Sequence, residues 1–175
     1  MLEIMRKRRS IRKFTSQDVT QAQVREILNA GMFAPSAWNR RPWHFIVIRN
    51  KELLTNLSGT SKYSKFVADA PVTIVVCGDM VLSPLWVEDT SIAATCMLLA
   101  ASTMGLGSTW TEVHGTERPD GTEGTPEEYV CQVLGIPEKF GVLCMLPIGY
   151  PAEEHRPHGD QEYEENKISY DGFGK

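Results

Sequence analysis

The chain has 175 residues, a formal net charge of −4, 42% hydrophobic residues and 23% charged residues. This length suits one domain of roughly 100–200 residues, so we expect residues 1–175 to form a single domain. The sequence has no apolar run of about 20 residues, no signal-peptide pattern and no overall basic charge, which argues against membrane-spanning, exported and nucleic-acid-binding classes. We therefore expect a cytoplasmic protein with no nucleic-acid or membrane partner.

The charges are distributed unevenly along the chain. Basic side chains crowd the start and acidic ones the end: Arg6, Lys7, Arg8, Arg9, Arg12 and Lys13 against Glu153, Glu154, Asp160, Glu162, Glu164 and Glu165. A basic start on an acidic chain favours a local anionic ligand such as a phosphate, although such a run taken alone more often marks a solvated helix face. The cysteines, Cys77, Cys96, Cys131 and Cys144, lack C-x-x-C spacing and lie in apolar segments, which favours buried free thiols.

The first half of the chain predicts two helices and an extended segment before the first strand. A short helix is expected over Leu2–Lys7, followed by an extended segment to Phe14. Thr20 and Gln23 form a capping box that begins a second helix, which ends before Ala34-Pro35. Its apolar face consists of Val24, Ile27, Leu28 and Met32.

Two strands follow a polar turn at residues 35–42. The first is expected over Trp43–Ile48, and a short helix near Lys51–Leu57 comes next. The β-branched run Val72–Cys77 then predicts a fully buried strand. We expect these two strands to form the middle of the sheet.

The second half begins with a long helix, Trp86–Met104, that is apolar on nearly every side. Such a helix is buried in a core or at a subunit interface. The domain is then completed by a strand over Ser108–Val113 and a loop over His114–Gly124. A helix follows, capped by Thr125 and Glu128 and closed by Gly135, and the last strand is expected over Val142–Tyr150. The polar residues 152–175 are expected to form an extended C-terminal arm, and the fold class is α+β.

Two short segments carry candidate binding groups. Arg8, Ser10 and Arg12 alternate, so an extended backbone would point all three toward one ligand, and guanidinium forks suit phosphate. The turn at residues 35–42 offers Ser36 and Asn39. Each of these patterns alone is more often a solvated face or a plain turn.

The ordered set of segments resembles the nitroreductase family of FMN-dependent oxidoreductases. The matching pieces are Arg8–Phe14, Ala34–Asn39 with Pro42-Trp43, Ala100–Gly107 ahead of Trp110, and Ile148–Glu154. The resemblance implies a central mixed, mainly antiparallel sheet flanked by helices, and a homodimer with shared FMN sites. It also implies that NAD(P)H is the electron donor.

The resemblance assigns roles to individual positions. Arg8, Arg9 and Ser10 would hold the FMN phosphate and ribityl chain, and Arg12 would lie at the pyrimidine edge of the ring. The turn would reach the flavin from the other subunit through Pro35, Ser36, Ala37 and Asn39. Thr111 and Glu112 would face the N5 side of the flavin, by position in the chain.

The chain also departs from the family pattern. Arg41 stands where members often have glutamine. The family's second basic phosphate ligand follows the Gly-Tyr-Pro step, and here Arg156 and His158 are both candidates. His155 and His158 form a His-x-x-His, but on a polar tail without a cysteine partner we interpret them as surface residues and expect no metal site.

No side chain in the matched segments is an obvious acid or base, and none is required if the flavin carries the redox step. The function predicted from the resemblance is hydride transfer from NAD(P)H through flavin N5 to a nitroaromatic, a quinone or a similar small acceptor. A specialised flavin enzyme such as a dehalogenase, with the loop at residues 114–124 controlling substrate entry, is one alternative. A non-enzymatic FMN-binding protein is another.

Overall fold

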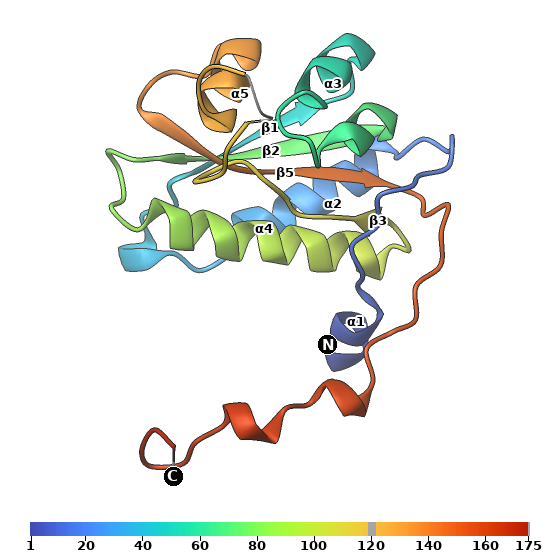
Figure 1. Cartoon of the computed structure of the whole chain (residues 1–175), viewed down its shortest axis with the longest axis vertical. Coiled ribbons are helices and arrows are strands. Elements are labelled where there is room, and N and C mark those ends of the chain that lie inside the picture. Colours follow the sequence, from blue (N-terminus) through green and yellow to red (C-terminus); the bar gives the residue numbers. More distant parts are fainter. Residues whose placement is uncertain (119–121, 175) are drawn as a thin grey trace.

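The computed structural model describes residues 1–118 and 122–174, in which a five-stranded sheet lies between two layers of helices (Figure 1). The strands are β1 (Trp43–Ile48), β2 (Val72–Asp79), β3 (Gly107–Ser108), β4 (Thr111–Glu112) and β5 (Phe140–Gly149). Their order is β1-β2-β5-β3, with β4 also paired to β5, and each of these pairings is antiparallel. The α+β fold is confirmed.

The helices divide between the two faces of the sheet (Figure 1). Helices α2 (Gln21–Met32) and α4 (Trp86–Thr103) cover one face, while α3 (Lys51–Leu57) and α5 (Pro126–Leu134) cover the other. Short 3-10 turns occur at η1 (Ala37–Asn39), η2 (Lys65–Asp69), η3 (Asp160–Glu162) and η4 (Glu165–Lys167). Both predicted capping boxes are present, at Thr20 and at Thr125, and Gly135 ends α5 with φ 65°.

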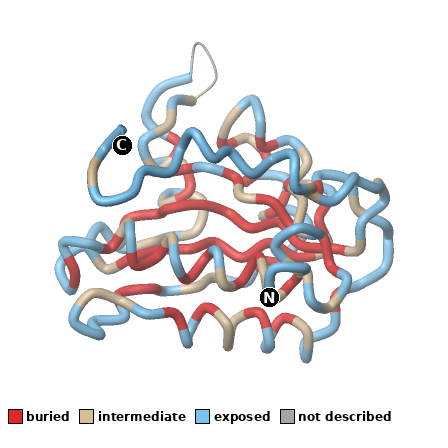
Figure 2. The backbone as a smooth tube through the Cα atoms, turned by 90° about the horizontal axis from the view of Figure 1, so that it is seen from below, coloured by how far each residue is buried: buried red, intermediate tan, exposed pale blue. Residues whose placement is uncertain are grey.

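Two hydrophobic cores follow from this layering. Val72, Ile74 and Val76 of β2 face the α2 and α4 side, whereas Val75 and Cys77 face the α3 and α5 side. Side chains alternate between the faces of a strand, so a strand buried on both faces is apolar throughout. Figure 2 shows the buried residues concentrated in the sheet and in the helix faces that contact it.

Several sequence expectations require correction. β1 is an edge strand, because β2 pairs with it on one side only, and its four central residues are exposed or only partly buried. The strand expected over Ser108–Val113 is divided into β3 and β4, which pair with β5 in one continuous register but leave residues 109 and 110 outside both strands. The pairing ends at Glu112, where β5 is irregular and Leu143 O accepts from both Val113 N and His114 N. One chain does not cover α4 all round, since Ile92 is 41% exposed, so the subunit-interface alternative stays a prediction; Met32, expected on the apolar face of α2, is also 41% exposed.

The C-terminal arm, residues 152–174, extends away from the sheet and is joined to the body near α1 (Leu2–Lys7) (Figure 1). Arg6 pairs with Asp160, and His158 N donates to Arg6 O at 2.9 Å. Beyond these contacts the arm is exposed along most of its length (Figure 2). Within the described part of the chain, no helix combines the length and hydropathy needed to cross a bilayer.

Trp86 packs against a smooth patch made by two paired glycines, Gly78 on β2 and Gly141 on β5. A Cβ at Gly141 would lie 2.5 Å from Trp86 Cη2. We expect Gly141→Ala to lower the free energy of unfolding by about 1–3 kcal/mol, because overpacking forces strain into a closely packed region. Urea denaturation measures this loss.

The matched background is Trp86→Leu, in which the crowding atoms are gone. The destabilisation caused by Gly141→Ala should shrink there, as contact residues are coupled in a double-mutant cycle. An equal loss in both backgrounds would contradict the packing explanation.

Candidate functional site

The N-terminal segment, residues 8–15, lies between β3 and the chain that follows β5. Ile11 N donates to Ser108 O at 3.1 Å, and Ile11 covers Gly107, where a Cβ would come within 2.7 Å of its side chain. On the other side, Thr15 N donates to Tyr150 O at 2.9 Å and Ala152 N donates to Lys13 O at 2.9 Å. The segment is therefore fixed from both sides.

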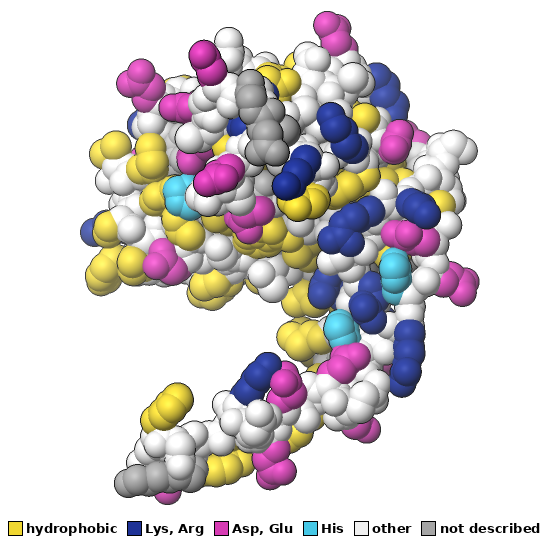
Figure 3. Space-filling model, in the orientation of Figure 1, with side chains coloured by type: hydrophobic (Ala, Val, Ile, Leu, Met, Phe, Trp, Pro, Cys, Tyr) yellow, Lys and Arg dark blue, Asp and Glu magenta, His cyan; other side chains and the backbone are white. Residues whose placement is uncertain are grey.

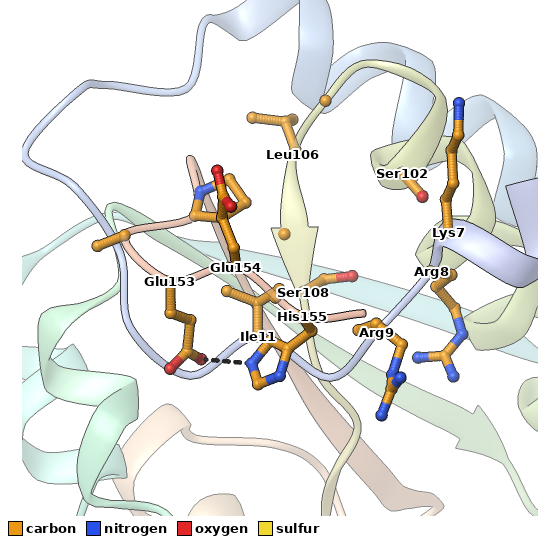
Figure 4. A pocket seen from close by; sticks show the side chains of 14 residues that line it. Lys7, Arg8, Arg9, Ile11, Ser102, Leu106, Ser108, Glu153, Glu154 and His155 are labelled. Carbon is orange, nitrogen blue, oxygen red and sulfur yellow. Dashed lines mark ion pairs between the residues drawn. The ribbon is translucent and has the colours of Figure 1, made fainter. Parts of the chain in front are cut away.

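One pocket, here called the arginine cleft, has a volume of about 610 Å³ and opens beside this segment (Figure 4). It lies between the end of α4 and the chain after β5, and its lining includes Lys7, Arg8, Arg9, Ile11, Ser102, Gly107, Ser108, Glu153, Glu154 and His155. Arg9 donates to Arg156 O. The Arg8 guanidinium, by contrast, has no ion pair or hydrogen bond with any residue the structure describes.

Glu153 forms part of the opposite wall of the arginine cleft (Figure 4). Its Oε1 accepts from Arg12 N at 3.0 Å and lies 3.3 Å from His155 Nε2. The Arg12 backbone donor and then His155 lower the pKa of the Glu153 carboxyl. This carboxylate therefore holds the N-terminal segment to the chain after β5.

A second pocket, here called the aromatic pocket, has a volume of about 770 Å³. Arg12 lines it together with Phe66, Trp110, Thr111 and Glu112, and the Arg12 guanidinium lies 5.8 Å from the Phe66 ring centroid. Trp110 Nε1 donates to Glu112 Oε2 at 2.7 Å. Thr111 is 5% exposed, and among described residues its Oγ1 has no hydrogen-bond partner. A buried hydroxyl without a partner costs free energy, so a ligand that reaches it gains affinity.

The predicted binding turn lies at the start of α4. Ala37 N donates to Asp89 Oδ1 at 2.7 Å, and the other oxygen of this buried carboxylate accepts from Ser83 Oγ at 2.9 Å. Trp38 and Asn39 have φ of 50° and 55°. Positive φ in non-glycine residues is strained, and such strain concentrates at functional sites.

The turn and the arginine cleft lie at opposite ends of α4 (Figure 1). The turn is bonded to Asp89, whereas Ser102 lines the cleft. Thirteen residues of helix separate these two positions, which is about 20 Å at 1.5 Å per residue. One chain therefore does not bring the turn and the arginines together.

Comparisons with known proteins place the chain in the family that its sequence motifs indicate. The model of the nitroreductase family matches residues 5–63 and 58–150. The chain belongs to the nitroreductase family. A Methanothermobacter thermautotrophicus protein, named provisionally an NADH dehydrogenase/NAD(P)H nitroreductase, is 43% identical over 156 residues, covering 87% of this chain and 78% of its own length.

Two solved nitroreductase structures are similar over nearly the whole chain. An FMN-dependent nitroreductase from Clostridium difficile R20291 has a TM-score of 0.94 and 35% identity, covering 99% of this chain and 100% of that one. A structure from Desulfovibrio desulfuricans, described as a nitroreductase in complex with FMN, has a TM-score of 0.78 and 26% identity, covering 98% and 96%. The nitroreductase fold is thus confirmed.

The structure distributes the predicted arginines over two pockets. Arg8 and Arg9 line the arginine cleft, while Arg12 lines the aromatic pocket with Thr111 and Glu112. The segment does not present one alternating face to a single pocket, because Arg9 and Ile11 also line the arginine cleft; that Arg8, Ser10 and Arg12 contact one ligand stays a prediction. Ser10 forms an isolated bridge with Ser108 and lines neither pocket.

The two candidates near the C-terminus also lie outside the cleft lining. Arg156 meets the site through its carbonyl, which accepts from Arg9, while the His158 ring pairs with Glu162. His155 lines the cleft instead, and its position shortly after the Gly-Tyr-Pro step could have identified it as a candidate. Lys62, Tyr63 and Phe66 were also missed, although an exposed aromatic beside a lysine in a connection is a signal for a binding surface.

The thiols take no part in either pocket. Cys77 and Cys144 are buried, and burial raises the pKa of Cys77 to about 12. Cys96 and Cys131 are only partly buried, which corrects the expectation for those two. A thiol with a raised pKa stays protonated at neutral pH and is a poor nucleophile.

Asp89 is the main polar contact between the turn and α4. We expect Asp89→Asn to speed hydrogen exchange of the amides at residues 36–41. The asparagine side chain has one acceptor oxygen, so either Ala37 N or Ser83 Oγ loses its partner, which costs about 1–3 kcal/mol of stability. Mass spectrometry of exchange measures this. The control is Glu88→Gln, which removes a charge from the neighbouring exposed residue. Equal exchange in the two variants would show that Asp89 does not hold the turn.

Proposed function

We propose that the chain binds FMN and transfers a hydride from NADH or NADPH to a small oxidised acceptor such as a nitroaromatic or a quinone. The observation that carries this proposal is the pair of pockets on one fixed segment, in which Ile11 lines the arginine cleft and Arg12 lines the aromatic pocket. A phosphate group requires cationic side chains in its binding site, and a flavin ring requires a flat pocket wall with polar groups at its edges. The names of the two similar solved structures support FMN as the ligand.

The arginine cleft suits the phosphate end of FMN. Lys7, Arg8 and Arg9 supply positive charge, and Arg8 is available because no described residue occupies its guanidinium. Guanidinium groups bind phosphate through charge-assisted, often bidentate, hydrogen bonds. Of the two C-terminal candidates we favour Arg156, since its backbone meets Arg9 while His158 is paired with Glu162. Ser10 remains a candidate for the ribityl chain.

The aromatic pocket suits the ring end. Bound FMN supplies two-electron hydride chemistry that no side chain here can supply. The Arg12 charge would stabilise the negative charge that a reduced ring carries at its pyrimidine edge. Thr111 Oγ1 would gain a partner at the ring, and Glu112 keeps Trp110 in place through their hydrogen bond.

The overall reaction then balances without a protein acid or base. With a quinone, NAD(P)H and one proton yield NAD(P)⁺ and the hydroquinone. With a nitroaromatic, the first two-electron step yields NAD(P)⁺, the nitroso compound and water. The protein contributes binding, orientation and the fixed charge of Arg12.

A homodimer would complete each site. The turn with Pro35, Ser36, Ala37 and Asn39 lies about 20 Å along α4 from the arginine cleft of its own chain. If two α4 helices pack antiparallel about a two-fold axis near Thr95 and Cys96, midway between Asp89 and Ser102, each turn reaches the cleft of the other chain. An isologous interface of this kind gives two equivalent sites.

The exposed apolar side chains favour a second copy as the partner. Leu85 just before α4, Ile92 on α4 and Trp38 on the turn are exposed, as are Tyr170 and Phe173 on the arm. Figure 3 shows hydrophobic side chains on the surfaces that border the hollow between the body and the arm. Exposed apolar patches of this kind mark interaction surfaces.

FMN titration tests the cofactor proposal directly. We expect purified protein to bind FMN and, once loaded, to oxidise NAD(P)H when menadione is present. Arg8→Ala should weaken FMN binding roughly tenfold to hundredfold, since one charge-assisted contact contributes about 1.5–3 kcal/mol. Lys13→Ala, a nearby exposed cation outside both pockets, is the matched control. A wild-type chain that does not take up FMN would refute the function, and equal affinity in Arg8→Ala would remove Arg8 from the site.

Ile92→Asp tests the shared site. A charge at the centre of an apolar interface should dissociate the dimer in sedimentation, and FMN affinity should fall with it although Ile92 lines neither pocket. Thr55→Asp, on the exposed side of α3 across the sheet, should change neither quantity. A monomeric Ile92→Asp protein with wild-type FMN affinity would contradict the shared site.

A further inference from the structure

The outer half of the aromatic pocket has no role in the proposed flavin site. Arg12, Thr111 and Glu112 form its inner wall, but the lining continues to residues 61–63, between α3 and η2, to Phe66 on η2, and to residues 116–118, between β4 and α5. The pocket volume of about 770 Å³ is within the usual range for small-molecule sites, roughly 300–1,000 Å³. A flat ligand lying beside the flavin would contact these outer residues.

Two cations from different connections face this outer half. Lys62 Nζ lies 5.1 Å from the Tyr63 ring centroid, and the Arg118 guanidinium lies 4.2 Å from the ring centroid of Tyr129. Arg118 also donates to Glu123 O at 3.2 Å, which fixes its position, while its buried Nε has no partner. Within residues 1–118 and 122–174, neither cation forms an ion pair, although Glu117 also lines the pocket. Cations without a counter-ion favour an anionic ligand.

Aromatic rings form the remaining walls. Tyr63 is 74% exposed, and Phe66 and Trp110 line the same pocket. Trp110 is held by its hydrogen bond to Glu112. Aromatic side chains bind planar rings by offset or edge contacts, so these walls fit a planar ligand better than a flexible one.

We propose that the acceptor is a planar aromatic compound bearing an anionic group, with its ring against Tyr63 and Phe66 and its anion at Lys62 and Arg118. This assignment rests on the proposed function. For a nitroaromatic carboxylate, the nitro nitrogen accepts two electrons and loses one oxygen as water, NAD(P)H is oxidised to NAD(P)⁺, one proton is consumed, and the carboxylate is unchanged. The two cations are binding and specificity residues, and they take no part in the redox step.

The nicotinamide donor also combines a ring with anionic phosphates, so the test must separate donor from acceptor. Calorimetry with the FMN-loaded protein measures binding of benzoate and of benzamide, an unreducible pair that differs in charge. Lys62→Gln and Arg118→Gln should each raise the Kd of benzoate about fivefold to tenfold and change that of benzamide less than twofold. Lys65→Gln, a nearby exposed lysine outside the pocket, should bind both as wild type does.

A second arm measures the two half-reactions separately by stopped flow. Reoxidation of photoreduced protein by 4-nitrobenzoate should slow in Lys62→Gln and Arg118→Gln, while reduction of the oxidised protein by NADH stays near the wild-type rate. Slower reduction by NADH with unchanged benzoate affinity would assign the cations to the donor and overturn the proposal. Equal loss of benzoate and benzamide, or loss of neither, would overturn it as well. Absence of FMN binding by the wild-type chain would refute the proposed function and, with it, this acceptor site.

Discussion

The contact between Ile11 and Gly107 determines how the whole N-terminal segment lies. Gly107 has no side chain, and Ile11 occupies that space with 6% of its surface exposed. The bond from Ile11 N to Ser108 O fixes the register at this point. A shift by one residue would bring Ser10 or Arg12 into an apolar position, and such register is strongly specified when one face is buried. With Ile11 in place, Arg8 and Arg9 face one pocket and Arg12 faces the other.

The length of α4 imposes a second constraint on the site. Its first turns hold the strained turn through Asp89, and its last residues border the arginine cleft. Trp38 and Asn39 have positive φ next to Ala37, whose N–H donates to the buried Asp89 carboxylate, so the turn is held in place by its own chain. Under the proposed function each chain would present two half-sites, and an antiparallel partner helix would bring different halves together.

Local signals in the sequence were sufficient for most elements. The capping boxes at Thr20 and Thr125 and the glycine at Gly135 mark their helix ends correctly, because capping depends on residues three positions apart. The buried run beginning at Val72 was equally clear. The edge position of β1 was not predictable, because pairing order depends on contacts between segments far apart in the chain.

The sequence predicted which side chains line the pockets better than it predicted how these side chains are arranged. Each of five predicted residues lines a pocket: Arg8, Arg9, Arg12, Thr111 and Glu112. Their division between two pockets depends on the contact of Ile11 with Gly107, which no periodic pattern in the sequence predicts. His155 is exposed, as expected, but its place in the cleft lining was not predictable, because its partner Glu153 is positioned only when the chain after β5 lies against the N-terminal segment. Lys62 and Tyr63 carry no family motif, and their proximity to Trp110 is purely tertiary.

The distribution of charge explains how an acidic chain can present basic pockets. Arg6 is paired with Asp160 and Arg49 is paired with Asp18, so these two cations serve the fold. The Glu153 carboxylate accepts from Arg12 N, and this bond lowers the pKa of the carboxyl. The Arg12 side chain faces the aromatic pocket, while its backbone N–H is bonded to Glu153 on the other side. The electrostatic potential at a pocket depends on which nearby charged side chains are already paired within the protein, and the net charge of the chain does not determine it.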